Sequence, residues 1–227
     1  MLLWLKSYPL SSTQFDIYLD QLIYPTSSLY SIAEAVFIDA QVDACVFKQC
    51  LQALYNQHDA LRLSLCGEKA APRQAFLLSG NVEWQQVDLC HYQDDREAVL
   101  QWLTHEVNKA IDMFSAPLYR FYLIKLSANR YCWLHKYHHL IADGWSISIY
   151  ANQVLSAYFD NTRQQPFTGQ NISYRYHIDK DYKYLNSPAI NKTNTIGCPK
   201  IVGRYRQPCL KILCTIIKGI QANCVFA

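Results

Sequence analysis

The chain has 227 residues, of which 51% are apolar and 14% aromatic. Such a composition supplies a sizeable packed core, and it excludes a disordered or a fibrous chain. The net charge of +3 is too small by itself to indicate a nucleic-acid surface, so no nucleic-acid partner is expected.

The first half of the chain is predicted to mix helices with strands. Ser11, Ser12 and Thr13 offer N-caps for a helix that ends before Pro25, and Asp43 caps a second helix with apolar residues at intervals of three and four. Period-two alternation and β-rich runs indicate strands between and after these helices. The elements predicted here are helices at 13–23 and from 43 onward, and strands at 31–40, 61–65, 74–78 and 82–87.

The middle of the chain continues the mixture. A helix is predicted from Asp94 to about Ala110, and two β-rich runs at 118–126 and 131–138 flank the turn Ser127-Ala128-Asn129. These runs should form an antiparallel hairpin, followed directly by a helix at 145–158. Strands and helices mixed in this way predict an α/β fold of the α+β sandwich type, a mixed sheet with flanking helices.

Charge is distributed unevenly between the two ends of the chain. Residues 1–181 hold all 18 acidic residues and 14 of the 21 Lys and Arg, whereas residues 182–227 hold the other 7 basic residues and no acid. One interpretation is a basic tail that binds an anionic partner. We favour the other, a chain end that does not fold with the rest, because its basic residues form no clear stripe.

Cysteine spacing and hydropathy bear on the compartment. The nine cysteines include no Cys-x-x-Cys pair, which argues against a zinc ribbon or a thioredoxin-type site. Scattered cysteines in odd number suit buried thiols in a reducing compartment. The short apolar run before Lys6 is unlike a signal peptide, and no stretch reaches the ~18–20 apolar residues of a membrane span. We therefore expect a cytoplasmic protein without a membrane partner.

Two adjacent histidines mark the candidate site. His138 and His139 end a predicted strand, and Asp143 and Gly144 lie at the turn into the next helix. Successive strand residues point to opposite faces, so one histidine should face inward and the other should reach a cleft. With an ordinary pKa of ~6.5, a histidine here is suited to general-base chemistry. Asp143 could brace the turn, and Gly144 permits a backbone turn with positive φ.

A metal site and a purely structural histidine pair are the alternatives. His135 and His139 share a strand face but lie ~13 Å apart along it, too far to bind one ion together. His139 and Asp143 could supply two ligands, yet no third is evident, so no metal is expected. The motif has four defined positions, which disfavours a chance structural pair.

The segment His138-His139-Leu140-Ile141-Ala142-Asp143-Gly144 resembles the His-His-x-x-x-Asp-Gly signature of condensation domains from nonribosomal peptide synthetases. These belong to an acyltransferase superfamily that includes chloramphenicol acetyltransferase. Three other segments resemble family motifs in order and spacing. They are Leu10–Tyr18, His58-Asp59-Ala60-Leu61-Arg62 and Ala116-Pro117-Leu118-Tyr119-Arg120.

The resemblance implies a role for each matching residue. His139 would be catalytic, either orienting or deprotonating the attacking amine or stabilising the oxyanion. Asp143 would be structural and pair with Arg62, a bidentate-capable partner. Gly144 would line the tunnel through which the phosphopantetheine arm of a carrier enters, and His138 would pack or hydrogen-bond. No cofactor would bind directly, because the substrates arrive on phosphopantetheine arms.

The resemblance covers 1–188, which would form the N-terminal lobe of a chloramphenicol acetyltransferase-like fold, and leaves 189–227 unassigned, as an out-of-frame or disordered tail. The partners of this chain would be carrier-protein domains and the missing C-terminal lobe. Without that lobe we expect little amide-forming activity. Whether the chain is itself an enzyme is left open. A freestanding CoA-dependent acyltransferase, completed by oligomerisation, and a non-catalytic carrier-binding module are the alternatives.

Overall fold

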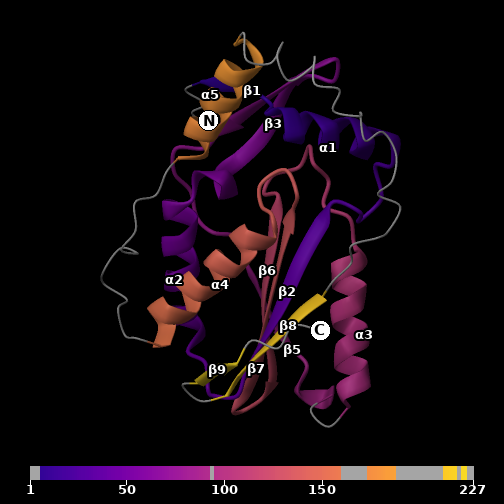
Figure 1. Ribbon diagram of the computed structural model, residues 1–227. Helices are drawn as coiled ribbons and strands as arrows, with labels where there is room; N and C mark the ends of the chain where they lie inside the picture. Colours follow the sequence, from indigo (N-terminus) through magenta and orange to yellow (C-terminus); the bar gives the residue numbers. More distant parts are fainter. Residues whose placement is uncertain (1–5, 93–94, 160–172, 188–211, 219–220, 224–227) are drawn as a thin grey trace.

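The computed structural model describes residues 6–92, 95–159, 173–187, 212–218 and 221–223. A mixed six-stranded sheet forms its centre, with the strand order β5-β6-β7-β2-β8-β9 (Figure 1). These strands are β2 (Ser31–Ile38), β5 (Gln85–Asp88), β6 (Tyr119–Ser127), β7 (Arg130–His138), β8 (Ile212–Lys218) and β9 (Gln221–Asn223). The predicted hairpin is confirmed, since β6 and β7 pair antiparallel. β2 pairs antiparallel with β7, and this pairing brings Ser31 opposite His138.

A second, three-stranded sheet lies at one end of the molecule, with the order β1-β4-β3 (Figure 1). Its strands are β1 (Ser7–Pro9), β3 (Leu63–Glu68) and β4 (Ala71–Phe76). Gly67 adopts φ 84° in β3, close to the turn into β4. This positive φ costs glycine little because it has no Cβ.

Helices cover both faces of the large sheet (Figure 1). On one face lie α2 (Ala44–Gln57) and α4 (Gly144–Phe159), which pack with alternate residues of β2, β6 and β7 around Phe47 and Trp133. On the other lies α3 (Arg96–Asn108), which packs through Leu103 on the opposite residues of the same strands. α1 (Ser12–Ile23) and α5 (Tyr174–Leu185) lie toward the end that carries the small sheet. This arrangement, with helices on both faces of a mixed sheet, confirms the predicted α/β sandwich.

One cation is buried between the sheet and α3. Lys136, which is only 2% exposed, donates from Nζ to the backbone carbonyls of Glu106 and Lys109 at the end of α3. The last carbonyls of a helix have no partner within the helix, and a lysine ammonium supplies one. Burial lowers the pKa of Lys136 to about 8.

Most predicted elements appear within a few residues of their expected bounds. The segment 59–62 differs, because it forms a 3₁₀ turn, Asp59–Arg62, before β3 begins at Leu63. α5 was not predicted, and its one buried residue, Ile178, leaves no apolar stripe to find. β8 and β9 fall in the stretch left unassigned, where β8 pairs parallel with β2; the remainder of 189–227 lies outside the described residues.

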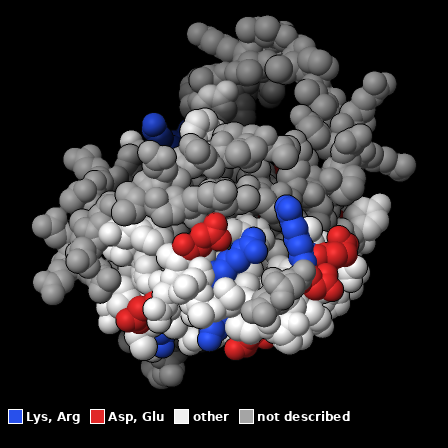
Figure 2. Space-filling model, turned by 90° about the horizontal axis from the view of Figure 1, so that it is seen from below, with Lys and Arg blue, Asp and Glu red and all other residues white. Residues whose placement is uncertain are grey.

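On the face of the molecule seen in Figure 2, acidic and basic side chains of the described residues are intermixed rather than gathered by sign. Within the described residues, no helix is both long and apolar enough to cross a membrane.

Candidate active site

The two motif histidines lie where β7 gives way to the turn before α4. The backbone N–H of His138 donates to the Leu118 carbonyl at 2.9 Å, and that of His139 donates to the Tyr30 carbonyl at 2.8 Å. His138 is 1% exposed, whereas His139 is only partly buried. The strand therefore presents one histidine to the interior and the other toward the surface, as its alternation predicts.

His138 has a hydrogen-bonding role inside the turn. Its Nδ1 accepts from the backbone N–H of Leu140 at 3.1 Å, which places the ring proton on Nε2. Burial, reinforced by the nearby His139, lowers the pKa of His138 to about 4. The ring is therefore neutral at pH 7 and acts as a fixed acceptor for the backbone that follows His139.

His139 keeps the properties of a base. Burial lowers the pKa of its ring, while a hydrogen bond with the Ala142 backbone and the charge of Asp143 oppose that change. A pKa below the ordinary value of 6.5 leaves the ring neutral and able to accept a proton near pH 7. A partly exposed, neutral imidazole at a strand-to-helix turn suits proton transfer to a ligand that approaches from outside.

Asp143 is the N-cap of α4. Its carboxylate accepts from the backbone N–H of Ser146 at 2.8 Å and from the Ser146 hydroxyl at 2.6 Å. Burial acts to raise the pKa of Asp143, but the two hydrogen bonds from Ser146, together with the residue's own backbone N–H and the nearby His139, lower it overall. An acidic N-cap satisfies free helix N–H groups and interacts well with the helix dipole. Asp143 thus fixes the point at which the His139 turn enters α4.

The prediction that Asp143 forms an ion pair with Arg62 is wrong. Arg62 follows the C-terminal end of α2 and donates its guanidinium N–H groups to three backbone carbonyls. These belong to Tyr55, Asn56 and Leu77, two of them in the last turn of α2. Arginine satisfies the end of that helix, and the capped Asp143 needs no cation.

The acid that pairs with a cation in this region is Asp59. Its carboxylate accepts from the Tyr174 N–H at 2.9 Å and from the Ser173 hydroxyl, and it lies 3.4 Å from Nε of Arg175. Asp59 thereby ties the segment 58–62 to the first turn of α5. Sequence reasoning missed this contact, since nothing in the intervening stretch signalled a helix that needs a partner.

Gly144 begins α4 without the positive φ that its residue type had suggested. A Cβ built at this position would meet no atom within 4 Å, so the space beside Gly144 is open. Trp145, the next residue, is 81% exposed. The glycine is therefore required neither by backbone conformation nor by a close neighbour within this lobe.

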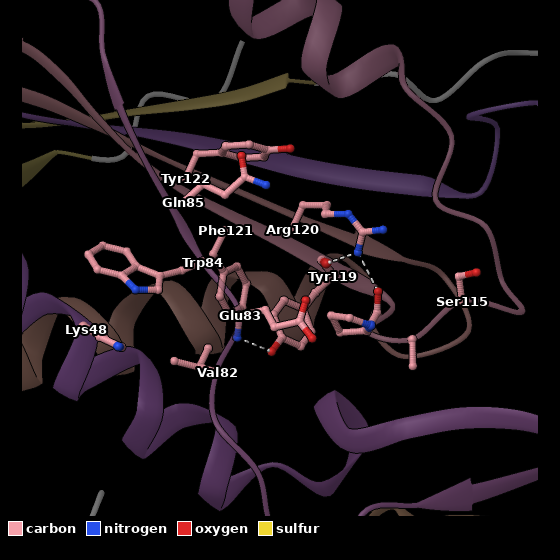
Figure 3. A pocket seen from close by; sticks show the side chains of 12 residues that line it. Lys48, Val82, Glu83, Trp84, Gln85, Ser115, Tyr119, Arg120, Phe121 and Tyr122 are labelled. Atoms are coloured by element: carbon pink, nitrogen blue, oxygen red, sulfur yellow. Dashed lines mark hydrogen bonds between the residues drawn. The ribbon is translucent and has the colours of Figure 1, made fainter.

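A separate cavity of about 550 Å³ lies between the segment that leads into β5 and the start of β6 (Figure 3). The Tyr119 hydroxyl accepts from the Glu83 N–H at 3.1 Å on its wall, and Arg120 donates to the Pro117 carbonyl at 2.6 Å. Neither His138 nor His139 lines this cavity, so it is not part of the candidate site.

Comparison with known proteins gives the family. A sequence profile described as the condensation domain matches residues 5–195. The isonitrile lipopeptide synthase of Streptomyces coeruleorubidus is 28% identical over 159 residues, which cover 70% of this chain and 11% of that protein. Gramicidin S synthase 2 of Aneurinibacillus migulanus is 27% identical over 188 residues, which cover 83% of this chain and 4% of that protein.

Solved structures show the same fold. The starter condensation domain of the rhizomide synthetase RzmA superposes with a TM-score of 0.75 at 24% identity, covering 84% of this chain and 48% of that one. The first condensation domain of the calcium-dependent antibiotic synthetase gives 0.70 at 17% identity, covering 82% and 45%. The chain thus spans about half of these solved domains. With the profile matching most of its length, the chain belongs to the condensation-domain family.

Proposed function

We propose that the chain supplies the histidine-bearing lobe of an amide-forming site. In the reaction, an amine nitrogen attacks the carbonyl carbon of a donor thioester, a C–N bond forms, the C–S bond breaks, and the thiol leaves. The amine loses a proton, and the departing thiolate takes one up. A base held beside the amine serves both transfers.

The observation that carries this proposal is the position of His139, partly exposed in the hydrogen-bonded turn between β7 and α4. His139 is partly buried, its lowered pKa leaves the ring neutral near pH 7, and it lies in a turn whose backbone is hydrogen-bonded to Tyr30, just before β2, and to His138. A fixed imidazole orients or deprotonates an incoming amine, or donates to the oxyanion, with little reorganisation. Asp143 acts through the backbone, because it caps α4 and so sets where the turn ends.

The surface beside the turn is suited to contact with a second lobe. Trp145 and Ile149 are 81% and 48% exposed, and their i, i+4 spacing places them on one face of α4. Together with the open space at Gly144, this apolar face is suited to a second lobe and to a phosphopantetheine arm. Carrier-protein domains are the proposed partners, and the substrates arrive on their arms. The free thiols at Cys45, Cys66 and Cys90 favour the cytoplasm as the compartment.

The experiment uses a donor carrier loaded with an acyl group, an acceptor carrier loaded with an amino acid, and the C-terminal lobe of a homologous condensation domain added as a separate chain. We expect amide product with the wild type and a loss of roughly 10²–10⁴-fold with His139→Ala, typical of a removed general base. His138→Asn, which keeps an acceptor for the Leu140 N–H, is the matched control and should lose far less. Full activity of His139→Ala would overturn the proposal, and acyl transfer from a CoA thioester without carriers would favour a freestanding acyltransferase.

A further inference from the structure

Two buried glutamines from distant parts of the chain form a reciprocal amide pair. Nε2 of Gln14 donates to Oε1 of Gln74 at 3.0 Å, and Nε2 of Gln74 donates to Oε1 of Gln14 at 2.8 Å. Gln14 comes from the first turn of α1 and Gln74 from β4. They are 2% and 0% exposed, respectively. Two neutral amides in the interior need a full set of partners, since a buried polar group without one destabilises the fold.

The remaining hydrogen bonds of the pair show how it is anchored. The second N–H of Gln74 donates to the Pro9 carbonyl at 2.8 Å, and Oε1 of Gln14 also accepts from the Ser11 N–H at 2.9 Å. The Ser11 hydroxyl accepts in return from the Gln14 N–H, completing a capping box. All four amide N–H groups are then used, and the last of them reaches the candidate site.

That last N–H comes from Gln14, which donates to the Leu140 carbonyl at 2.9 Å. The Leu140 N–H donates to His138 Nδ1, and the Ile141 N–H donates to the His138 carbonyl at 3.0 Å. Leu140, the residue after His139, is therefore held at both its N–H and its carbonyl. Gln14 supplies a contact from outside the turn, in addition to the Tyr30 carbonyl, and ties the turn to α1 and the small sheet.

We propose that Gln14 is a positioning residue for His139, and that Gln74 satisfies the rest of its amide. This inference rests on the proposed function in taking His139 as the reacting group. Gln14 does not touch a substrate. It fixes the carbonyl of Leu140, and through it the direction in which the His139 ring leaves the turn. Without this donor the buried carbonyl must find water, and the turn relaxes toward solvent.

The test compares Gln14→Met with Gln74→Met in the full chain, with each histidine ring titrated by NMR. Both changes remove one member of the pair at similar volume and without adding charge, but only the first removes the donor to Leu140. In Gln14→Met the His139 ring becomes more hydrated, so we expect its pKa to rise toward 6.5 by at least about 0.5. In Gln74→Met the shift should stay below about 0.2. Equal shifts in both variants, or an unchanged ring in Gln14→Met, would overturn the proposal.

A second measurement needs no variant. In native-state hydrogen exchange of the wild type, the amides of Leu140 and Ile141 should open with the same free energy as those of Ser11 and Gln14, as one cooperative unit. If the turn opens at lower free energy than α1, the two are not coupled and the proposal fails. Neither experiment uses carriers or a second lobe, so a negative reconstitution would count against the proposed function alone.

Discussion

Acid should destabilise the fold through His138. The folded protein keeps this ring neutral, because burial lowers its pKa to about 4. In the unfolded chain the ring takes up a proton below its ordinary pKa of ~6.5. Unfolding therefore binds a proton between these values. The stability contributed by neutral His138 is fully present above pH ~6.5 and is lost as the pH falls toward 4.

The size of the effect follows from the two pKa values. A difference of ~2.5 units corresponds to about 3 kcal/mol once the loss is complete, and to about 2 kcal/mol at pH ~5. Such a loss is a large part of the free energy of unfolding of a typical domain, ~5–15 kcal/mol. It should therefore be measurable without extreme acid.

The assay is urea unfolding at about pH 7.5 and about pH 5, for the wild type and for His138→Asn. Asparagine places its side-chain oxygen where Nδ1 lies, so it still accepts from Leu140, yet it does not titrate. The wild type should lose about 2 kcal/mol more than the variant on acidification. If both proteins lose the same free energy within ~0.5 kcal/mol, His138 is not the group responsible.

Three further predictions concern polar contacts at the ends of helices. Asp143→Ala should lower the free energy of unfolding by about 1 kcal/mol through loss of the α4 N-cap. A double-mutant cycle with Arg62→Ala should show a coupling energy below ~0.5 kcal/mol, and a larger coupling would show that Asp143 and Arg62 do interact. Asp59→Ala should speed hydrogen exchange across 174–185 while β6 and β7 stay protected, and Asp59→Asn should keep most of the protection of 174–185. Equal exchange in the two variants would contradict the prediction that Asp59 caps α5. Lys136→Met should lower the free energy of unfolding in urea by about 2 kcal/mol, since two carbonyls lose their donor, and an unchanged value would show that water replaces it.

Elements with a regular apolar period were predictable from the sequence. α2 buries Phe47, Leu51 and Leu54 at helical spacing, and the hairpin β6–β7 joins two β-rich runs across a short turn. The end of β7 at the adjacent histidines followed from the same alternation. α5 escaped prediction because its stability comes from polar contacts made by Asp59 and Asp181 rather than from an apolar stripe.

The partners of the site residues were less predictable. Arg62 was expected to bind a carboxylate, but it binds carbonyls, and backbone carbonyls leave no mark in a sequence. Asp143 likewise binds a helix N-terminus. Gln14 was part of a recognised motif, yet its reach to Leu140 depends on a glutamine in β4 that no motif singled out. Contacts between elements far apart in the chain are set by the tertiary fold.

We propose that this chain holds the reactive histidine of a site that a second lobe completes. The most direct measurement is single-turnover amide formation from two loaded carriers, with and without the complementary lobe of a homologous condensation domain. We predict no product from the chain alone, product when the lobe is added, and its loss in His139→Ala. Product from the chain alone, or product that survives His139→Ala, would contradict this account.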